Sequence, residues 1–198
     1  QKILKRATER RIFHGKKMFG MCRSILFLLS VSILLASCQS DLEVVEKTDD
    51  QGYVERYTVR KEDGAKEGWY VKSAPNTIIL EETQFVNDTV HGLSIQYYPN
   101  GDTLSVTTYE KGIRNGQQIV YYADGGIEEV VTYTNGSKTG PFVEYWKDGK
   151  LKTEGTYFDG HENGDIKNYD QRGNHYRTLN CIDDVCITKW IDPAYDRQ

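Results

Sequence analysis

Cysteines are the residues with the clearest chemistry in this sequence. Cys181 and Cys186 are separated by four residues near the C-terminal end. An even pair of this kind forms a disulfide in an oxidising compartment, and here it would close a small loop around residues 182–185. Two reduced thiols are the alternative, and a metal pair lacks the second ligand pair that structural zinc sites use. We therefore expect a disulfide and no metal.

Cys38 stands at the end of a basic and then apolar segment, a context that indicates different chemistry. Lys16, Lys17 and Arg23 precede a 12-residue apolar run, Ile25–Ala36, which is broken only by serines. A membrane-spanning helix needs about 20 residues, so the run is too short to span but has the length of a secretory signal core. A buried apolar helix with a core cysteine is the alternative.

The end of this segment, Leu35-Ala36-Ser37-Cys38, resembles the lipobox of bacterial lipoproteins. The resemblance implies cleavage just before Cys38, a diacylglycerol on its thiol and an acylated amino terminus. Several acyl chains anchor a protein stably, whereas one chain binds only marginally. We therefore expect a signal peptide over residues 18–37 and an envelope protein that lipidated Cys38 holds at the outer membrane.

The segments on either side of this signal differ in charge. Residues 1–17 carry seven Lys or Arg residues and one Glu. Such a run could be a basic arm for nucleic acid, but because a signal peptide follows, we expect sequence upstream of a start at Met18 or Met21. Residues 38–52 are expected to be the lipidated cysteine and an acidic tether.

The chain after residue 37 is strongly acidic. Its 17 basic and 28 acidic residues give a net charge of −11 with histidine neutral. Nucleic acid and anionic lipid headgroups both repel such a surface. We therefore expect no nucleic-acid partner, and contact with a membrane only through the lipid anchor.

Candidate catalytic groups do not assemble into a recognisable pattern. Adjacent acids such as Glu128 and Glu129 should point to opposite faces of a strand, which argues against paired acid–base work. The histidines His91, His161 and His175 share no repeat position, so they indicate no metal site. We expect a protein that is not an enzyme and has no cofactor.

Glycines recur every 24 residues, which indicates internal repeats. Three series share this period. They are Gly68, Gly92, Gly116, Gly140 and Gly164; Gly101, Gly125, Gly149 and Gly173; and Gly64, Gly112, Gly136 and Gly160, with Asp88 in the one vacancy. The repeats define a domain over residues 53–187, with a C-terminal tail over 188–198.

Aromatic residues keep the same period in three columns. The columns are Tyr97, Tyr121, Tyr145 and Tyr169; Tyr98, Tyr122 and Trp146, with Asp170 next; and Phe85, Tyr109, Tyr133 and Tyr157. The residues around them are β-branched or aromatic and are separated by short glycine-containing turns, which is typical of strands joined as hairpins. The sequence therefore predicts an all-β fold: a single elongated antiparallel meander of about eleven strands, built from 24-residue hairpin repeats.

Turn geometry fixes the expected register. Asn100-Gly101 is the dipeptide favoured in two-residue type I′ turns, which would pair Tyr97 with Leu104. A four-residue loop over 112–115 would then pair Val106 with Tyr121. Alternation along each strand divides the side chains between two faces. One face collects Leu93, Ile95, Tyr97, Leu104, Val106, Ile119, Tyr121, Val130, Val143 and Tyr145; the other collects Tyr98, Tyr109, Tyr122, Val131, Tyr133, Phe142, Trp146 and Tyr157.

The segment from Tyr133 through Gly136 and Gly140 to Tyr145-Trp-Lys-Asp-Gly149 resembles a MORN repeat. More closely, it is similar to the bacterial variant of that repeat, found in proteins often labelled as antitoxin components of toxin–antitoxin systems. The resemblance covers residues 53–187 and implies an elongated, non-enzymatic β-meander without catalytic residues.

The column Tyr98, Tyr122 and Trp146 is the candidate binding face, although cross-strand aromatic pairs also support sheets by roughly 0.2–1 kcal/mol each. We therefore expect a non-catalytic binding or scaffolding module for a protein partner. A carbohydrate-binding module that stacks sugars on this column is one alternative. An antitoxin or immunity-type partner protein is the other.

Overall fold

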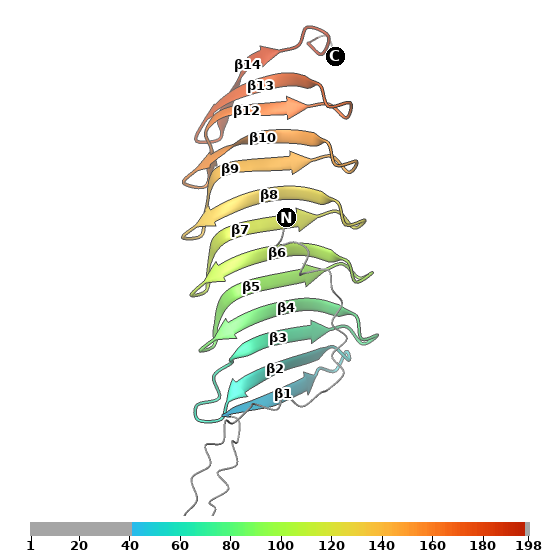
Figure 1. Cartoon of the computed structure of the whole chain (residues 1–198), viewed down its shortest axis with the longest axis vertical. Helices are drawn as coiled ribbons and strands as arrows, with labels where there is room; N and C mark the ends of the chain where they lie inside the picture. The colour runs from blue at the N-terminus through green and yellow to red at the C-terminus, as the bar shows by residue number, and fades with distance from the viewer. Residues whose placement is uncertain (1–40, 197–198) are drawn as a thin grey trace, which may run out of the picture. The chain divides into compact units, whose positions relative to one another are not determined.

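The computed structural model describes residues 41–196, which form one antiparallel sheet of fourteen strands (Figure 1). The all-β meander is therefore confirmed. The strands are β1 (Leu42–Thr48), β2 (Val54–Arg60), β3 (Gly68–Ser73), β4 (Ile79–Val86), β5 (Thr89–Tyr97), β6 (Thr103–Glu110), β7 (Ile113–Tyr121), β8 (Ile127–Thr134), β9 (Ser137–Tyr145), β10 (Leu151–Phe158), β11 (His161–Glu162), β12 (Gly164–Tyr169), β13 (His175–Ile182) and β14 (Val185–Ile191).

Strand order follows chain order throughout, except that the short β11 pairs only with β10. The predicted extension 1–17, the signal peptide and Cys38 lie outside the described residues. Within those residues, no helix is long and apolar enough to cross a membrane.

The sheet begins earlier and ends later than the expected repeat domain. β1 lies inside the predicted acidic tether and pairs with β2 from Leu42–Arg60 to Thr48–Val54. Val44 and Val45 supply the β-branched residues that favour a strand, while the acids beside them remain exposed on the sheet edge, where charge discourages further pairing. The tether expectation is therefore wrong for residues 42–48, and β14 likewise extends into the expected tail.

One margin of the sheet is formed by five two-residue turns, each with positive φ at both central residues, as type I′ turns require. The turns are Asn87-Asp88, Lys111-Gly112, Asn135-Gly136, Asp159-Gly160 and Asp183-Asp184. In each, the second residue donates its backbone N–H to a carbonyl at the corresponding margin of the preceding repeat, for example Gly136 to Arg114 at 2.9 Å. These turns therefore join neighbouring repeats as well as neighbouring strands.

The turns at the opposite margin are of a different type, so the expected type I′ turn at Asn100-Gly101 is wrong. Only Gly101 has positive φ there, +87°, and its N–H donates to the Tyr98 carbonyl at 2.8 Å. This is a turn followed by a left-handed glycine, which leaves a bulge in the strand. Tyr97 consequently pairs with Thr103 instead of Leu104.

The pairing of β6 with β7 also differs from the expected register. Val106 lies opposite Ile119 instead of Tyr121, because the connection is a two-residue turn followed by a bulge near Gly116. The difference is an even number of residues, so the side chains of these strands keep their predicted faces. The predicted alternation of the strand residues between two faces is therefore confirmed, whereas the predicted pairing of Val106 with Tyr121 is wrong.

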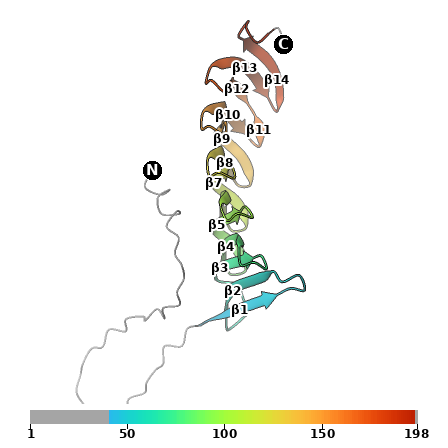
Figure 2. The ribbon, with the colours of Figure 1, turned by 90° about the vertical axis from the view of Figure 1, so that its right-hand side faces the viewer.

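The core lies on one face of the sheet. Val131 is completely buried, and Phe142 and Ile166 are each 2% exposed. In a sheet with a single layer, such burial requires the strands to curve around these side chains, and Figure 2 shows that curvature. We call the face that carries Val131 the core face, and the opposite face, which carries Val130, the ladder face.

Gly155 makes room for two core side chains, those of Phe142 and Ile166. A Cβ atom at this position would lie 2.7 Å from Cε1 of Phe142 and 2.3 Å from Cδ1 of Ile166. Towards the N-terminal end, Tyr57, Ala65 and Tyr70 are also buried. Hydrogen-bonded polar side chains lie beside them, such as Thr83 and Ser94, whose hydroxyl oxygens lie 2.9 Å apart. The buried apolar cluster around Val131 lies in the C-terminal half of the sheet.

Candidate interaction surface

A continuous row of aliphatic side chains crosses five strands on the ladder face. Cross-strand pairing joins its members one after another across β5 to β9. They are Ile95, Val106, Ile119, Val130 and Val143. All five are only partly buried, and none belongs to the buried core cluster. The row, which we call the aliphatic row, is therefore an apolar surface on the side of the sheet away from the core.

The first aromatic column runs beside the aliphatic row, because tyrosines of the column follow row positions by two residues on β5, β7 and β9. At the two ends of the column the hydroxyls are occupied: Tyr97 donates to Glu82 at 2.7 Å and Tyr169 donates to Glu154 at 2.8 Å. In the middle, the hydroxyls of Tyr121 and Tyr145 have no hydrogen-bond partner among residues 41–196.

The carboxylates at the ends of this surface are bonded within the chain. The Tyr169 hydroxyl and then the Lys167 ammonium hold the pKa of Glu154 below its usual value, and Lys167 lies 3.0 Å from that carboxylate. Burial and the bond to Glu82 raise the pKa of Tyr97, so its hydroxyl remains a donor. An apolar centre with a polar margin is the usual anatomy of a protein-binding surface.

Exposed large apolar side chains extend the same face. The strand register places Trp69 opposite Gln84, Leu93 opposite Thr108 and Ile113 opposite Glu110, all directed away from the core. Phe158, which follows core residue Tyr157, is the most exposed aromatic residue between positions 41 and 196, at 67%. Several exposed apolar side chains on one face indicate an interaction site more strongly than a single one does.

The predicted binding column, Tyr98, Tyr122 and Trp146, is bonded to the neighbouring repeat. The Tyr98 hydroxyl donates to the carbonyl of Tyr121 at 2.7 Å, and the Tyr122 hydroxyl donates to the carbonyl of Tyr145 at 2.7 Å. The indole N–H of Trp146 donates to the carbonyl of Tyr169 at 3.0 Å. All three rings are half-buried. This geometry supports the packing interpretation of the column.

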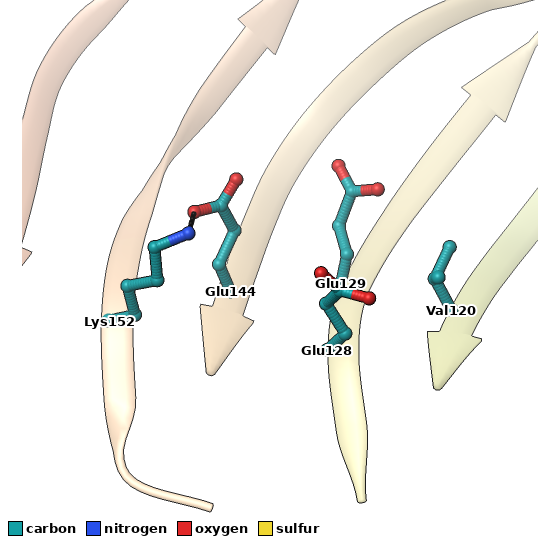
Figure 3. A pocket seen from close by; sticks show the side chains of 5 residues that line it. All are labelled: Val120, Glu128, Glu129, Glu144 and Lys152. Atoms are coloured by element: carbon teal, nitrogen blue, oxygen red, sulfur yellow. Dashed lines mark ion pairs between the residues drawn. The ribbon is translucent and has the colours of Figure 1, made fainter. Parts of the chain in front are cut away.

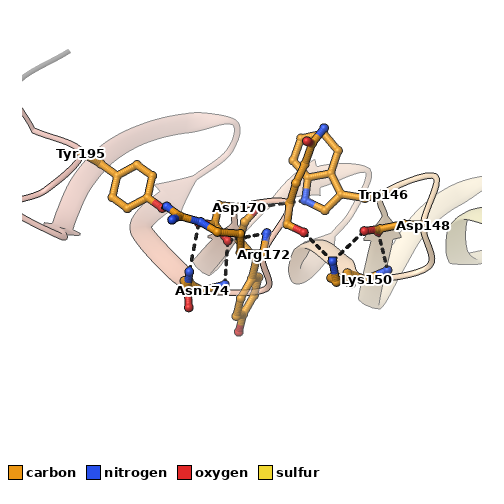
Figure 4. Close-up of polar contacts among 9 residues, drawn as sticks. Trp146, Asp148, Lys150, Asp170, Arg172, Asn174 and Tyr195 are labelled. Carbon is orange, nitrogen blue, oxygen red and sulfur yellow. Dashed lines mark hydrogen bonds and ion pairs between the residues drawn. The ribbon is translucent and has the colours of Figure 1, made fainter.

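The column ends at Asp170 (Figure 4). The first three members of the column donate hydrogen bonds from their side chains, whereas the carboxylate of Asp170 can only accept them. The Asp170 carboxylate accepts hydrogen bonds from the Tyr195 hydroxyl, from the Arg172 guanidinium at 3.2 Å and from the Asn174 backbone at 2.8 Å. These bonds, the one from Tyr195 first, hold the pKa of Asp170 far below its usual value. The ring of Tyr195 packs on Tyr176. The turn from Asp192 to Tyr195, which we call the last turn, therefore covers the end of the column.

The third aromatic column lies on the core face beneath a series of cations. Lys66 lies 5.1 Å from the ring centroid of Phe85, the Arg114 guanidinium 4.2 Å from that of Tyr133, and the Lys138 ammonium 4.8 Å from that of Tyr157. The spacing in the chain between cation and aromatic is the same in all three pairs. Contacts of this kind contribute about 0.5–2 kcal/mol each, depending on desolvation. They stabilise the repeat at the turn margin.

A shallow hollow of about 220 Å³ on the core face collects several carboxylates (Figure 3). Glu128 and Glu129 both line it, so the expectation that they point to opposite faces is wrong: a bulge in β8 places Ile127 and Glu128 together opposite Tyr121. Two of the acids are matched by cations. Lys138 lies 3.3 Å from Glu129, and Lys152 lies 3.1 Å from Glu144.

The predicted pair Cys181 and Cys186 forms a disulfide, with the two residues directly opposite on β13 and β14. The histidines His91, His161 and His175 lie on three different strands, β5, β11 and β13. His161 contacts Asp184 at 2.6 Å, His175 stacks on Trp190, and His91 accepts a weak bond from the Lys111 backbone.

The sequence analysis placed the ladder-face residues on one face of the sheet, but it did not select them as the candidate binding face. Only their register shows that the aliphatic side chains are mutual neighbours, and only the hydrogen bonds among residues 41–196 show that the hydroxyls of Tyr121 and Tyr145 have no partner there. The available signal was the repeat pattern itself. At the repeat position whose acids bond Tyr97 and Tyr169, namely Glu82 and Glu154, the middle repeats carry Val106 and Val130 instead.

Comparison with protein families identifies the repeats. Residues 90–111, 114–135 and 138–159 each match the MORN repeat variant, at the period that the glycine series predicted. The chain therefore carries MORN-type repeats, in agreement with the predicted resemblance. No curated protein matches the chain. The matched stretches run from β5 to β10, the part of the sheet that bears the aliphatic row.

Proposed function

We propose that this MORN-repeat chain is a non-catalytic binding module that docks a protein partner on its ladder face. The observation that carries the proposal is the aliphatic row with Tyr121 and Tyr145 beside it. Burying apolar area gains roughly 25 cal/mol per Å², and partly exposed valine, isoleucine and tyrosine side chains on a preformed sheet can realise that gain with little loss of conformational freedom.

The partner is expected to offer an apolar surface with a few acceptors or donors for the two tyrosine hydroxyls. A tyrosine whose ring packs while its hydroxyl finds a partner is a frequent energetic centre of protein interfaces. The aliphatic row carries no charge, and Lys167 already faces the Glu154 carboxylate at one end of the column. The binding is therefore expected to depend only weakly on salt.

The carbohydrate alternative has less support, because the donors of Tyr98, Tyr122 and Trp146 are already bound to backbone carbonyls. No observation favours the antitoxin-type role over other protein partners. The proposal includes an envelope location, with the sheet attached through lipid on Cys38; it rests on the lipobox resemblance and on the acidic charge of the remaining chain.

Photo-crosslinking tests this proposal. A photoreactive phenylalanine at Tyr145 should capture a discrete protein in the cells that produce the chain, and the same probe at Tyr109, on the core face, should not. Val130→Glu in the Tyr145 probe protein should abolish the crosslink, whereas Thr156→Glu, at an exposed position of the same face outside the row, should preserve it.

Two outcomes would refute protein docking on this face. One is equal crosslinking from Tyr145 and Tyr109. The other is a Tyr145 crosslink that survives Val130→Glu while the circular dichroism spectrum stays unchanged. Labelling of the chain with a fatty-acid analogue tests the anchor separately: Cys38→Ala should remove all label, and label retained on that variant would exclude lipidation at Cys38.

A further inference from the structure

Three potential metal ligands converge where β11, β13 and β14 meet. Cys181 and Cys186 are cross-strand partners with Cα atoms 4.0 Å apart. The Glu162 carboxylate oxygen Oε2 lies 3.9 Å from Sγ of Cys181 and 3.6 Å from Sγ of Cys186. All three ligand atoms lie within 4.8 Å of one another. Cys181 is completely buried and Glu162 is half-buried, so the cluster is part of the packed structure.

We propose that reduction of the Cys181–Cys186 disulfide uncovers a binding site for one thiophilic divalent cation, such as Zn²⁺, held by the two thiolates and the Glu162 carboxylate. A tetrahedral zinc ion with bonds of about 2.3 Å to sulfur and 2.0–2.2 Å to oxygen places those ligand atoms about 3.5 Å apart. The observed oxygen–sulfur distances exceed that value by only a few tenths of an ångström. The carboxylate is therefore already positioned.

The sulfurs must separate for the cation to enter. Two thiolates on one zinc ion lie about 3.8 Å apart, which is close to the 4.0 Å that separates the Cα atoms of Cys181 and Cys186. Rotation of the two side chains therefore supplies the separation, and the strands can keep their register. With three protein ligands, the fourth coordination position is left to water, as in zinc sites that are not purely structural.

The redox step needs a dithiol reductant. One thiolate of the reductant attacks a protein sulfur, which breaks the Cys181–Cys186 bond and forms a mixed disulfide. The second reductant thiol then displaces the remaining protein sulfur, so the reductant leaves as a cyclic disulfide. Two electrons and two protons end on the cysteines. Binding of the cation then releases both thiol protons.

The surroundings of Glu162 favour a cation. The carboxylate of Asp184 lies beside this residue and accepts the backbone N–H of Glu162 at 2.6 Å. A bound cation would offset the negative charge that these two acids bring together. In the disulfide form both sulfurs are bonded to each other and supply no thiolate, so the site is closed. The inference is independent of the ladder face and of the proposed partner.

Equilibrium binding of Zn²⁺, and the absorption spectrum of Co²⁺, test the site in the full chain. Every protein carries Cys22→Ser and Cys38→Ser, so that only the paired cysteines can respond. After reduction and removal of the reductant, we expect one Zn²⁺ per chain and a thiolate-to-cobalt absorption band. The oxidised protein should bind neither ion.

Variants separate the contributions of the ligands. Cys181→Ser with Cys186→Ser should abolish binding, and Glu162→Gln should weaken it at least tenfold while the thiolate–cobalt band persists. Asp183→Asn, a neutralised acid in the adjacent turn, is the matched control and should bind normally. Zn²⁺ binding by the reduced protein that is no tighter than by the double serine variant would overturn the site. Unchanged affinity of Glu162→Gln would remove the carboxylate from it.

Discussion

The indole nitrogen of Trp146 lies 3.0 Å from the backbone carbonyl oxygen of Tyr169 and donates a hydrogen bond to it across the boundary between two repeats. Tyr98 and Tyr122 make the equivalent bond with their hydroxyls, each to the corresponding carbonyl of the next repeat. Three side chains of two chemical types therefore perform one structural task, which is to join successive hairpins at the margin opposite the type I′ turns.

Removing one of these donors should lower stability without loss of ring packing. Tyr122→Phe is expected to reduce the free energy of unfolding by about 1 kcal/mol, the typical net value of one hydrogen bond. Denaturant unfolding followed by circular dichroism measures the change. Tyr53→Phe, in the loop before β2, is the control. Equal stability of Tyr122→Phe and the unmodified chain would show that the bond contributes nothing.

A side chain at Gly155 should disrupt the core. Gly155→Ala places a methyl group 2.3 Å from Ile166 and 2.7 Å from Phe142, and overpacking of this kind costs typically about 1–3 kcal/mol. Thermal unfolding should show a lower midpoint than for Thr156→Ala on the same strand. Adding Ile166→Val should recover part of the loss, since it removes the Cδ1 atom that lies closest to the new methyl group. Failure of that second substitution to recover stability would contradict the steric explanation.

Gly125 isolates the effect of backbone conformation from that of contacts. Its φ is +87°, and a Cβ atom there would meet nothing within 4 Å. Gly125→Val should still destabilise the chain by at least about 1 kcal/mol, because β-branched residues resist positive φ. The neighbouring Gly126 has no positive φ, so Gly126→Ala should cost less. Chemical denaturation of the two variants gives the comparison, and a larger loss at Gly126 would contradict the prediction.

Acid should weaken the last turn through Asp170. Its pKa is far below the usual value because Tyr195 and then the Asn174 backbone hydrogen-bond its carboxylate. A carboxyl with a lowered folded-state pKa contributes stability that is present above its unfolded pKa, about 3.9, and is lost as the pH falls toward the folded value. Tyr195→Phe should therefore lower the melting temperature near neutral pH by more than it does near pH 2. A constant difference between the two proteins across that range would contradict this linkage.

Much of the fold could be predicted because the repeat pattern is dense. Two faces, hairpin connections and an antiparallel meander all follow from the alternation of side chains and from the 24-residue period. The conformations of the turns were harder to predict. Lys111-Gly112 is a type I′ turn although lysine is not its usual residue, and Asn100-Gly101 has the favoured dipeptide but a different turn. Inter-repeat hydrogen bonds at both margins selected these conformations, and single-turn preferences do not include such bonds.

The binding surface was only partly visible in the sequence. Aromatic columns stand out by period, yet the free energy available for binding depends on which hydroxyls are already bonded. Tyr98 and Tyr121 belong to columns of the same period, but the hydroxyl of Tyr98 is bonded to a carbonyl, whereas that of Tyr121 has no partner within residues 41–196. β1 was missed because charged residues on an edge strand resemble the composition of a tether.

The hydrogen bonds that reach back from the type I′ turns, and those that reach forward from Tyr98, Tyr122 and Trp146, also determine how the domain can change length during evolution. Gain or loss of a whole repeat adds or removes two strands, so the next strand keeps its direction and its face, and both sets of bonds find an equivalent partner. Gain or loss of a single strand would reverse the polarity of everything that follows and separate each donor from its carbonyl. Length variation among proteins built on this pattern is therefore expected to occur in steps of one hairpin.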